Sequence, residues 1–294
     1  MISIARELDG FDIAQEIRQE RQIHKGSFLL LEGDGDIKRF GKFVDEDHCS
    51  IQNCFGRKNL LQAIDLLYEE GFPGVLGLAD ADFDRLNSCV AVHEGVIYSE
   101  GHDFDLDVAR SDVLRRYLLE VADQERCDAA GGIDGICNDL LERCKPLSVL
   151  RYVNHTQSLG YRLSQVRHRE FIKDGVVDLD ELITNVSSGK LAKNAPTLRS
   201  LVDSHVRMQY DLYQLTNGHD FLAFLGVDLQ GRLGDRKPPQ AWGSEVEIHF
   251  RLAFSEGDFV KRPLFRAVLA WEQDNPPYQI LKMSLSYHHS VSTQ

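Results

Sequence analysis

The chain has 294 residues, of which 43% are hydrophobic and 27% are charged, a balance typical of a soluble protein with one large domain or two modest ones. Its formal net charge of −13 gives no bulk attraction for a nucleic-acid backbone, although a bound divalent cation reverses the local field of an acidic site. The six cysteines form no CxxC pair, which argues against a zinc ribbon and a disulfide framework. Because no apolar stretch fits a membrane span or a signal peptide, we expect a cytoplasmic protein without membrane association.

The first part of the chain alternates between strand and helix patterns. Apolar runs typical of buried strands occur at 27–31, 50–55, 74–78 and 96–99. Apolar residues at helical spacing occur over 10–22, 36–44 and 60–71. This alternation predicts an α/β fold, a parallel sheet flanked by helices. In such sheets ligands bind beyond the carboxyl ends of the strands.

The pattern becomes mainly helical after residue 112. Helical periodicity occurs over 113–121, 136–144, 147–151 and 198–215, with polar connections at 187–196 and 231–239. The last part has enough large apolar residues for a core of its own: Trp242, Phe250, Phe254, Phe259, Phe265 and Trp271. We therefore predict an N-terminal helical segment at 1–24, an α/β domain at 25–112 and a mainly helical, mixed region at 113–294.

Acidic residues follow two of the predicted strands. Glu32-Gly33-Asp34-Gly35-Asp36 follows the first, and Asp80-Ala81-Asp82-Phe83-Asp84 follows the third. Each segment alone is also compatible with a plain acidic turn, in the first case at a helix N-terminus. Both clusters, however, fall at the carboxyl edge of the predicted sheet. Since two or three carboxylates suffice for Mg²⁺, the sequence predicts a magnesium site there.

The order of these motifs resembles a known family. A strand ending in Glu-Gly, then a helix, a strand, a helix and a strand ending in Asp-x-Asp resembles the TOPRIM domains of topoisomerases, bacterial primases and OLD-family nucleases. The likeness covers about residues 25–110 through the segments FLLLEGDGDIKRF, GRKNLLQAIDLL and GVLGLADADFDRL. Within this group, the chain is similar to the TOPRIM effector nucleases of phage anti-restriction-induced (PARIS) defence systems, a likeness to which Asn217-Gly218-His219-Asp220 adds.

The resemblance implies roles for individual residues. Glu32 matches the TOPRIM glutamate, a general acid/base that often belongs to the metal shell. Asp80 and Asp82 match the Asp-x-Asp pair that holds Mg²⁺, for which Mn²⁺ is an alternative. Asp36 stands where the family places a second acid, and Asp84 extends the pair. The implied catalytic residues are thus Glu32, Asp80 and Asp82, to which the implied metal ligands add Asp36 and Asp84.

The resemblance also implies a function, a Mg²⁺-dependent nuclease that acts as the toxic effector of bacterial antiphage defence. A partner ABC-type ATPase would hold it inactive until a phage protein is sensed, and the active form would be a homodimer that cleaves RNA, with tRNA favoured. The chain has no GxxxxGK[ST] signature, so an ATPase activity must come from another chain. Two other interpretations stay open: a non-catalytic module that binds metal and nucleotide, and a phosphatase or nucleotidyl transferase with a small substrate.

Basic residues that can hold a phosphate occur at several places. Arg57 and Lys58 begin the 60–71 helix at the same sheet edge, where a helix N-terminus and a lysine can anchor a phosphate, although Lys58 is equally compatible with an ordinary surface position. Three further clusters can hold a nucleic-acid backbone or form a plain solvated surface: Arg162, Arg167, His168 and Arg169; Arg232, Arg236 and Lys237; Lys261, Arg262 and Arg266. The tyrosines beside the first cluster, Tyr152 and Tyr161, can stack on bases.

Three other acids and two histidines have less specific patterns. Asp103, Asp105 and Asp107 follow the fourth predicted strand, where one can complete a metal shell and at least two are expected in a solvated loop. His102 and His219 have no partner ligands at a recognisable spacing, so we expect both to be structural.

Overall fold

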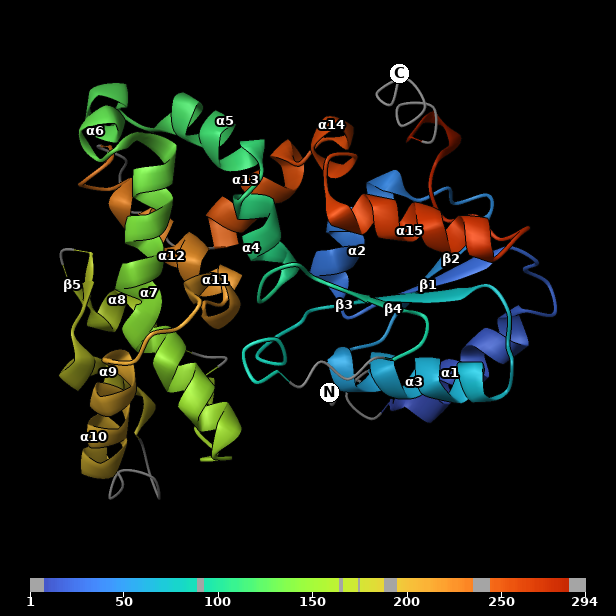
Figure 1. The fold of residues 1–294 in the computed structure, drawn as a ribbon, viewed down its shortest axis with the longest axis horizontal. Helices are drawn as coiled ribbons and strands as arrows, with labels where there is room; N and C mark the ends of the chain where they lie inside the picture. Colours follow the sequence, from blue (N-terminus) through green and yellow to red (C-terminus); the bar gives the residue numbers. More distant parts are fainter. Residues whose placement is uncertain are drawn as a thin grey trace, which may run out of the picture. The chain divides into compact units, whose positions relative to one another are not determined.

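The computed structural model describes residues 8–88, 93–163, 166–173, 175–187, 195–234 and 244–285 (Figure 1). The chain divides into two compact units. The sheet unit contains the described residues up to Ala81 together with 93–100 and 254–285. The helical unit contains 82–88 and the described residues of 101–253.

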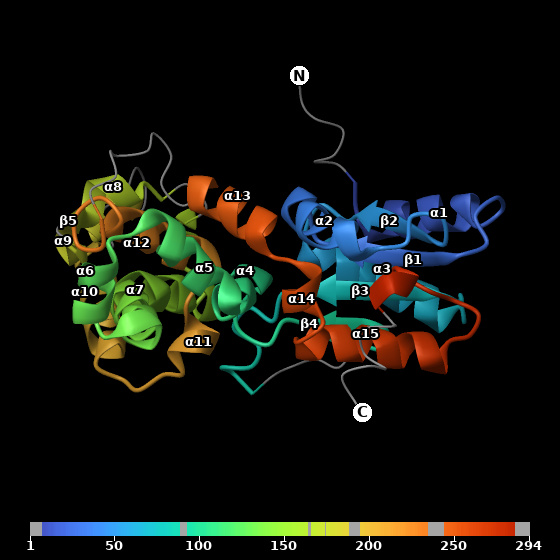
Figure 2. The same cartoon turned by 90° about the horizontal axis from the view of Figure 1, so that it is seen from above.

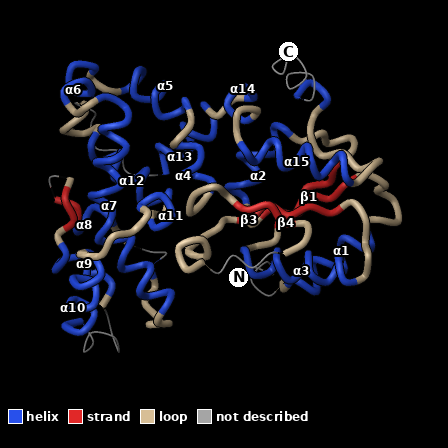
Figure 3. The backbone as a smooth tube through the Cα atoms, viewed as in Figure 1, coloured by secondary structure: helices blue, strands red, loops and turns tan. Residues whose placement is uncertain are grey.

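The sheet unit is organised around parallel strands, which are β1 (Ser27–Leu31), β2 (Cys49–Asn53), β3 (Val75–Ala79) and β4 (Val96–Tyr98). In the described residues their order is β2-β1-β3-β4, and each neighbouring pair is parallel. Helices lie on both sides of this sheet (Figure 3). The central strands β1 and β3 are buried at every position, which explains their continuous apolar sequences SFLLL and VLGLA. The α/β fold with a parallel sheet, predicted from the sequence, is therefore confirmed.

One face of the sheet is covered by α1 (Gly10–Glu20) and α3 (Arg57–Glu69) (Figure 1). The two helices pack against each other and share a core with Phe28 and Leu30 of β1. Asp9 caps the start of α1 by accepting the N–H groups of Phe11 and Asp12, so this helix begins as the sequence pattern requires.

The other face is covered by α2 (Asp34–Phe40) and α15 (Pro263–Asp274) (Figures 1 and 2). After α2 comes a short 3-10 turn (Gly41–Phe43), so the helix expected over 36–44 ends earlier than its pattern indicates. The Phe43 ring stacks on that of Phe259, in the short helix α14 (Glu256–Phe259), with 4.4 Å between the ring centroids.

The helical unit consists of one long helix and several shorter ones. Its helices are α4 (Phe104–Ala109), α5 (Asp112–Val121), α6 (Gln124–Ala129), α7 (Gly132–Thr156), α8 (His168–Phe171), α9 (Leu179–Val186), α10 (Ala195–Val206), α11 (Leu212–Leu215), α12 (Gly218–Asp228) and α13 (Ser244–Ala253). A small antiparallel hairpin joins β5 (Ile172–Lys173) to β6 (Val176–Val177). Helix α12 lies in the core, because its apolar residues from Phe221 to Leu225 are all fully buried. Over the described residues, no helix has both the length and the apolar character needed to cross a membrane.

Three expectations for the second half differ from the structure. Residues 136–144 and 147–151 form one helix, α7, which continues through Pro146 because the residues after the proline, from Leu147 to Leu150, are buried. Residues 198–215 form two helices, α10 and α11, because Asp211 caps a new start by accepting the Tyr213 N–H at 2.9 Å. Trp242 and residues 235–239 lie outside the described residues.

The third difference concerns residues 254–285, which belong to the sheet unit rather than to the helical region predicted at 113–294. Their aromatic rings explain this assignment. Phe254 and Phe259 contact Phe43, and the Ser27 hydroxyl donates to the carbonyl of Gln279 at 2.7 Å. The end of the chain thus completes the sheet unit's core.

We expect Gly74→Ala to destabilise the protein more than Gly71→Ala. Both glycines have left-handed backbones, with φ of +73° and +66°, so the backbone strain is matched. A Cβ at Gly74, however, would lie 2.3 Å from the Tyr278 ring, whereas a Cβ at Gly71 meets no atom within 4 Å. The difference in unfolding free energy, measured in urea, should be about 1–3 kcal/mol. Adding Tyr278→Ala should reduce it. Equal losses would show that Tyr278 does not pack against Gly74, the residue before β3.

Candidate functional site

Glu32 and Asp80 lie together at the carboxyl edge of the sheet. Each is the first residue after a central strand, and Leu31, the last residue of β1, lies opposite Leu78, the next-to-last residue of β3. The Asp80 backbone N–H donates to Oε1 of Glu32 at 2.7 Å. Both residues are half-buried. The hydrogen bond therefore fixes the direction of the Glu32 carboxylate toward the end of β3.

The start of α3 adjoins the same strand end. The Gly56 N–H donates to the Glu32 carbonyl oxygen at 2.7 Å, and Gly56 has φ of +125°, a conformation that favours glycine. Gly56 is the N-cap of α3 and makes no side-chain capping hydrogen bond, and the first turn contains no acidic residue. An N-terminus of this kind, at the positive end of the helix dipole, is suited to an anionic group.

The two basic residues expected to bind phosphate begin this helix. The guanidinium carbon of Arg57 lies 5.6 Å from the centroid of the Tyr98 ring, at the carboxyl end of β4. This contact holds the Arg57 side chain at the carboxyl edge of the sheet. Lys58 is the next residue and is exposed. The sheet unit thus carries acidic and basic groups at the same edge.

The two acids that follow Glu32 have partners within the sheet unit. Asp36 makes an ion pair with Arg39 at 2.5 Å, and the Arg39 side chain is only 3% exposed. A buried guanidinium needs a counter-charge, which gives Asp36 a stabilising role in α2. Asp34 is exposed and accepts a hydrogen bond from the Asn53 side chain at 2.7 Å. The sequence analysis named Asp34 in the first acidic segment without giving it a role, and it did not single out Asn53, which lay inside the strand predicted at 50–55 and ends the observed β2.

Asp82 and Asp84 belong to the helical unit. Asp82 has φ of +48°, which is uncommon for a residue other than glycine, and its N–H donates to the His102 carbonyl at 2.8 Å. Phe83 is buried, with 4.7 Å between its ring centroid and that of His102 and 5.4 Å to that of Tyr152. These contacts attach the segment from Asp82 to Ser88 to α7.

The donor set of the sheet unit is compatible with Mg²⁺. In the described ranges, no group of three or more His, Cys, Asp or Glu side chains is placed to hold a metal ion. Mg²⁺ usually takes only one or two protein carboxylates and fills its octahedron with water and substrate phosphates. The oxygen donors Glu32 and Asp80 therefore suit this ion by number and by chemistry.

Several residues expected to contact nucleic acid are used inside the helical unit. The Tyr152 ring packs against the rings of Phe83 and Tyr210, with 5.4 and 5.6 Å between the centroids. Tyr161 is buried, so both rings are used in packing within the helical unit. His168 is buried and lies 2.8 Å from Asp220, so the first basic cluster lacks one of its expected members. The reason is tertiary packing, which the local sequence does not encode.

The Asp220 carboxylate is fully buried in an ionic network. It accepts two hydrogen bonds from the Arg151 guanidinium, at 2.5 and 2.8 Å, and a third contact from His168. Burial opposes its ionisation, but the charge of Arg151 and the hydrogen bonds outweigh burial and hold the pKa of Asp220 well below its usual range. Asp220 therefore joins α7, α8 and α12.

The remaining basic residues of the three clusters make ion pairs or lie at exposed positions, and Arg167 does both, through its pair with Glu170 at 2.9 Å. Arg232 makes ion pairs with Asp228 and Asp139, and Arg262 pairs with Glu100 at 2.7 Å. The exposed members are Arg162, Arg167, Arg169, Lys261 and Arg266. Arg236 and Lys237 lie outside the described residues.

The acidic segment after β4 is buried, which corrects the expectation of a solvated loop. Asp103 caps α4 through the Leu106 N–H at 2.8 Å and also accepts the Gly218 N–H at 2.6 Å. Asp107 accepts the Gly101 N–H at 2.8 Å and the Tyr213 hydroxyl. Asp105, between them, is only half-buried.

The two histidines expected to be structural differ in exposure. His102 is buried, and burial lowers its pKa. Its Nδ1 lies 3.2 Å from the Gln214 carbonyl oxygen and its Nε2 lies 4.0 Å from Oδ1 of Asp82. The His219 side chain is 48% exposed, and its Nδ1 bonds to Glu247 of α13. The hydrogen bond to Glu247 raises the pKa of His219.

No family model and no curated protein matches the chain. The assignment of roles to these residues therefore depends on the geometry of the strand ends and on the resemblance in motif order.

Two replacements of Glu32 distinguish the contribution of its hydrogen bond to stability from that of its charge. Glu32→Ala removes the acceptor of the Asp80 N–H and should lower the unfolding free energy by about 1–3 kcal/mol, because a half-buried donor loses its partner. Glu32→Gln keeps an oxygen at this place and should cost less than Glu32→Ala. Urea unfolding of the two variants measures the difference, and identical losses would contradict the hydrogen bond.

The His219–Glu247 pair should make stability depend on pH. Because the pKa of His219 is raised above its ordinary value of 6.5, the folded state binds the proton more tightly than the unfolded state. The pair's contribution is therefore complete below that ordinary value and is lost as the pH rises through the raised pKa. The stability difference between the unmodified chain and His219→Gln should be larger at about pH 5.5 than at about pH 9, as measured by urea unfolding. A difference that does not vary with pH would contradict the pair.

Proposed function

We propose that the chain is a Mg²⁺-dependent nuclease of the TOPRIM type that cleaves RNA. The observation that carries the proposal is the hydrogen bond between the Asp80 N–H and the Glu32 carboxylate at the carboxyl edge of a parallel sheet. The adjoining start of α3, with Arg57 and Lys58, adds groups suited to a phosphate. An acid pair beside a helix N-terminus brings together groups that can hold a metal ion and a phosphate, the two components of metal-assisted phosphodiester hydrolysis.

The proposed roles follow from these positions. Glu32 acts as the general acid/base, and the bond from the Asp80 N–H orients its carboxylate. Asp80 would hold the metal ion, and Asp82, two residues further along the chain, is the second proposed carboxylate, with Asp84 beyond it. When bound, Mg²⁺ would neutralise charge on the scissile phosphate. Because Asp36 is paired with Arg39, its proposed contribution is to stabilise α2 beside the site.

The proposed biological role depends on the resemblance in motif order. The nuclease would be the toxic effector of an antiphage system in the cytoplasm, with tRNA as the favoured substrate. An ABC-type ATPase would be its partner, and the active form would be a homodimer.

Cleavage of tRNA by the purified chain tests the proposed activity. We expect fragments in the presence of Mg²⁺ or Mn²⁺ and none with EDTA. Glu32→Gln and Asp80→Asn should lower the rate by at least about 100-fold, the size typical of a lost general acid/base or metal ligand. The matched control is Glu69→Gln, an exposed acid at the opposite end of α3, which should leave the rate unchanged.

Other outcomes identify the rival functions. Preferred hydrolysis of mononucleotides over tRNA would replace the nuclease by a small-substrate phosphatase or nucleotidyl transferase. Metal binding without hydrolysis of any substrate would indicate a non-catalytic module. In cells that also express the genomic neighbour, triggered growth arrest that persists unchanged in both Glu32→Gln and Asp80→Asn would overturn the proposal.

A further inference from the structure

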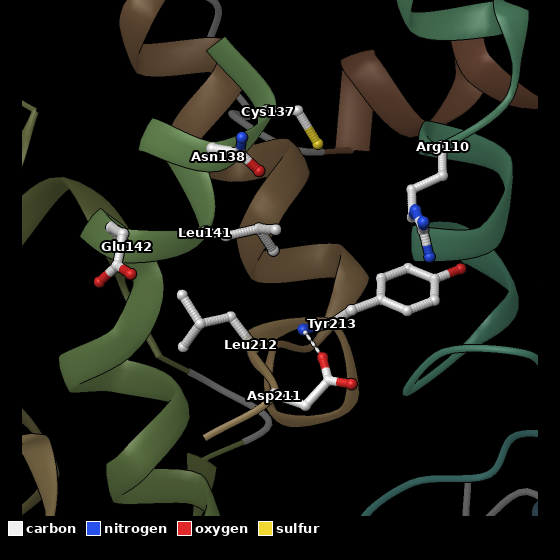
Figure 4. Close-up of a pocket in the computed structure, with 8 residues that line it drawn as sticks. All are labelled: Arg110, Cys137, Asn138, Leu141, Glu142, Asp211, Leu212 and Tyr213. Carbon is white, nitrogen blue, oxygen red and sulfur yellow. Dashed lines mark hydrogen bonds between the residues drawn. The ribbon is translucent and has the colours of Figure 1, made fainter. Parts of the chain in front are cut away.

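A cavity of about 420 Å³ lies within the helical unit, between the end of α4, α7 and α11 (Figure 4). Its volume is in the range of small-molecule binding sites. Charged, polar and apolar side chains line it together. None of these residues belongs to the proposed nuclease site.

One wall of the cavity is a stacked pair of side chains. The Arg110 guanidinium carbon lies 4.0 Å from the centroid of the Tyr213 ring. The Tyr213 hydroxyl donates to Asp107, which is buried and also accepts the Gly101 N–H. Gly101 leaves no room for a side chain, because an added Cβ would lie 2.5 Å from the Tyr213 ring. Asp107 and Gly101 thus hold the Tyr213 ring in position, and the ring in turn positions Arg110 in the absence of a ligand.

The other walls come from α7 and α11. Leu141 and Leu212 supply apolar surface, and Asn138 of α7 supplies an amide. Asp211 accepts the Tyr213 N–H at 2.9 Å, which sets the direction of its carboxylate (Figure 4). The thiol of Cys137 also lines the cavity, and burial raises its pKa.

This combination of groups matches the chemistry of a nucleotide. A guanidinium binds a phosphate through several N–H donors, and its flat face can stack on a base. Leucine side chains cover the face of a planar base, while a carboxylate and an amide oxygen accept hydrogen bonds from an exocyclic amino group. A purely anionic ligand would be repelled by Asp211 and by Glu142, which also lines the cavity, and a purely cationic one by Arg110.

We propose that the cavity binds a nucleoside monophosphate group whose base carries an exocyclic amino group. The phosphate would contact Arg110, and the base would lie on Leu141 and Leu212 with its amino group toward Asp211. The group can be a free nucleotide or an unpaired nucleotide of an RNA strand. The RNA source rests on the proposed nuclease function, for which the cavity would be a specificity subsite, whereas the binding itself does not depend on that function.

Calorimetric titration of the full chain with AMP, GMP, CMP and UMP, in EDTA, tests the binding separately from metal-dependent cleavage. UMP lacks the amino group and should bind most weakly. Arg110→Met keeps a long side chain over Tyr213 but removes the charge, and it should weaken binding at least about tenfold, the effect of losing charge-assisted hydrogen bonds. Arg115→Met, at an exposed position of α5 outside the cavity, is the matched control and should bind as the unmodified chain does.

Protection of Cys137 gives a readout located in the cavity. Peptide-level mass spectrometry should show slower alkylation of Cys137 when the nucleotide is bound. Asn138→Trp, at an exposed lining position, should fill the cavity and abolish binding while urea unfolding remains near that of the unmodified chain. This second variant keeps the test decisive if Arg110→Met fails to fold.

The same variants distinguish a free nucleotide from a nucleotide of an RNA strand as the ligand. Arg110-dependent binding of the monophosphates supports a free nucleotide, and Arg110-dependent binding of a single-stranded oligoribonucleotide alone supports the RNA source. If neither ligand binds, or if both bind Arg110→Met and Arg115→Met equally, the proposed site is overturned, whatever the outcome for tRNA cleavage.

Discussion

The hydrogen bond from the Asp80 N–H to the Glu32 carboxylate depends on how completely the two central strands are buried. β1 and β3 are covered at every position, so the first side chains that can reach solvent come directly after Leu31 and Ala79. These are Glu32 and Asp80, and the parallel register of the strands brings them to the same edge. The same packing places the start of α3 there, since Gly56 donates to the Glu32 carbonyl. The chemistry of this edge is thus a consequence of the sheet's burial.

Much of this edge was predictable from the sequence because its causes are local. An apolar run that ends in an acid and a glycine predicts both a buried strand and a polar strand end, as at Leu31-Glu32-Gly33. The contact between Glu32 and Asp80 was not predictable in detail, because it joins residues 48 positions apart and depends on the register of β1 and β3. The pairing of Asp36 with Arg39 is different, since three-residue spacing in a helix is a visible signal for an ion pair.

The helical unit was less predictable because its polar residues are paired across long stretches of sequence. The buried Asp103 binds the Gly218 N–H, 115 positions away, and Asp107 binds the Tyr213 hydroxyl, 106 positions away. A local pattern of alternating acids cannot distinguish such buried acceptors from a solvated loop. For the same reason, the aromatic residues at 254–285 predicted a hydrophobic core but did not show which unit the core belongs to. Their contacts with Phe43 assign them to the sheet unit.

The net charge of −13 constrains how such a chain can bind a polyanion. Bulk attraction is excluded, so affinity has to come from a few cationic groups held in fixed positions, where less side-chain entropy is lost on binding. Arg57 and Arg110 meet this requirement by different means. Arg57 is held over Tyr98 beside a helix N-terminus, and Arg110 is held over Tyr213, whose hydroxyl is bound by Asp107. In the second case a buried carboxylate fixes the tyrosine, and the tyrosine in turn holds a guanidinium, so an acidic residue contributes to the wall proposed to contact a phosphate. An acidic composition is therefore compatible with the proposed RNA substrate.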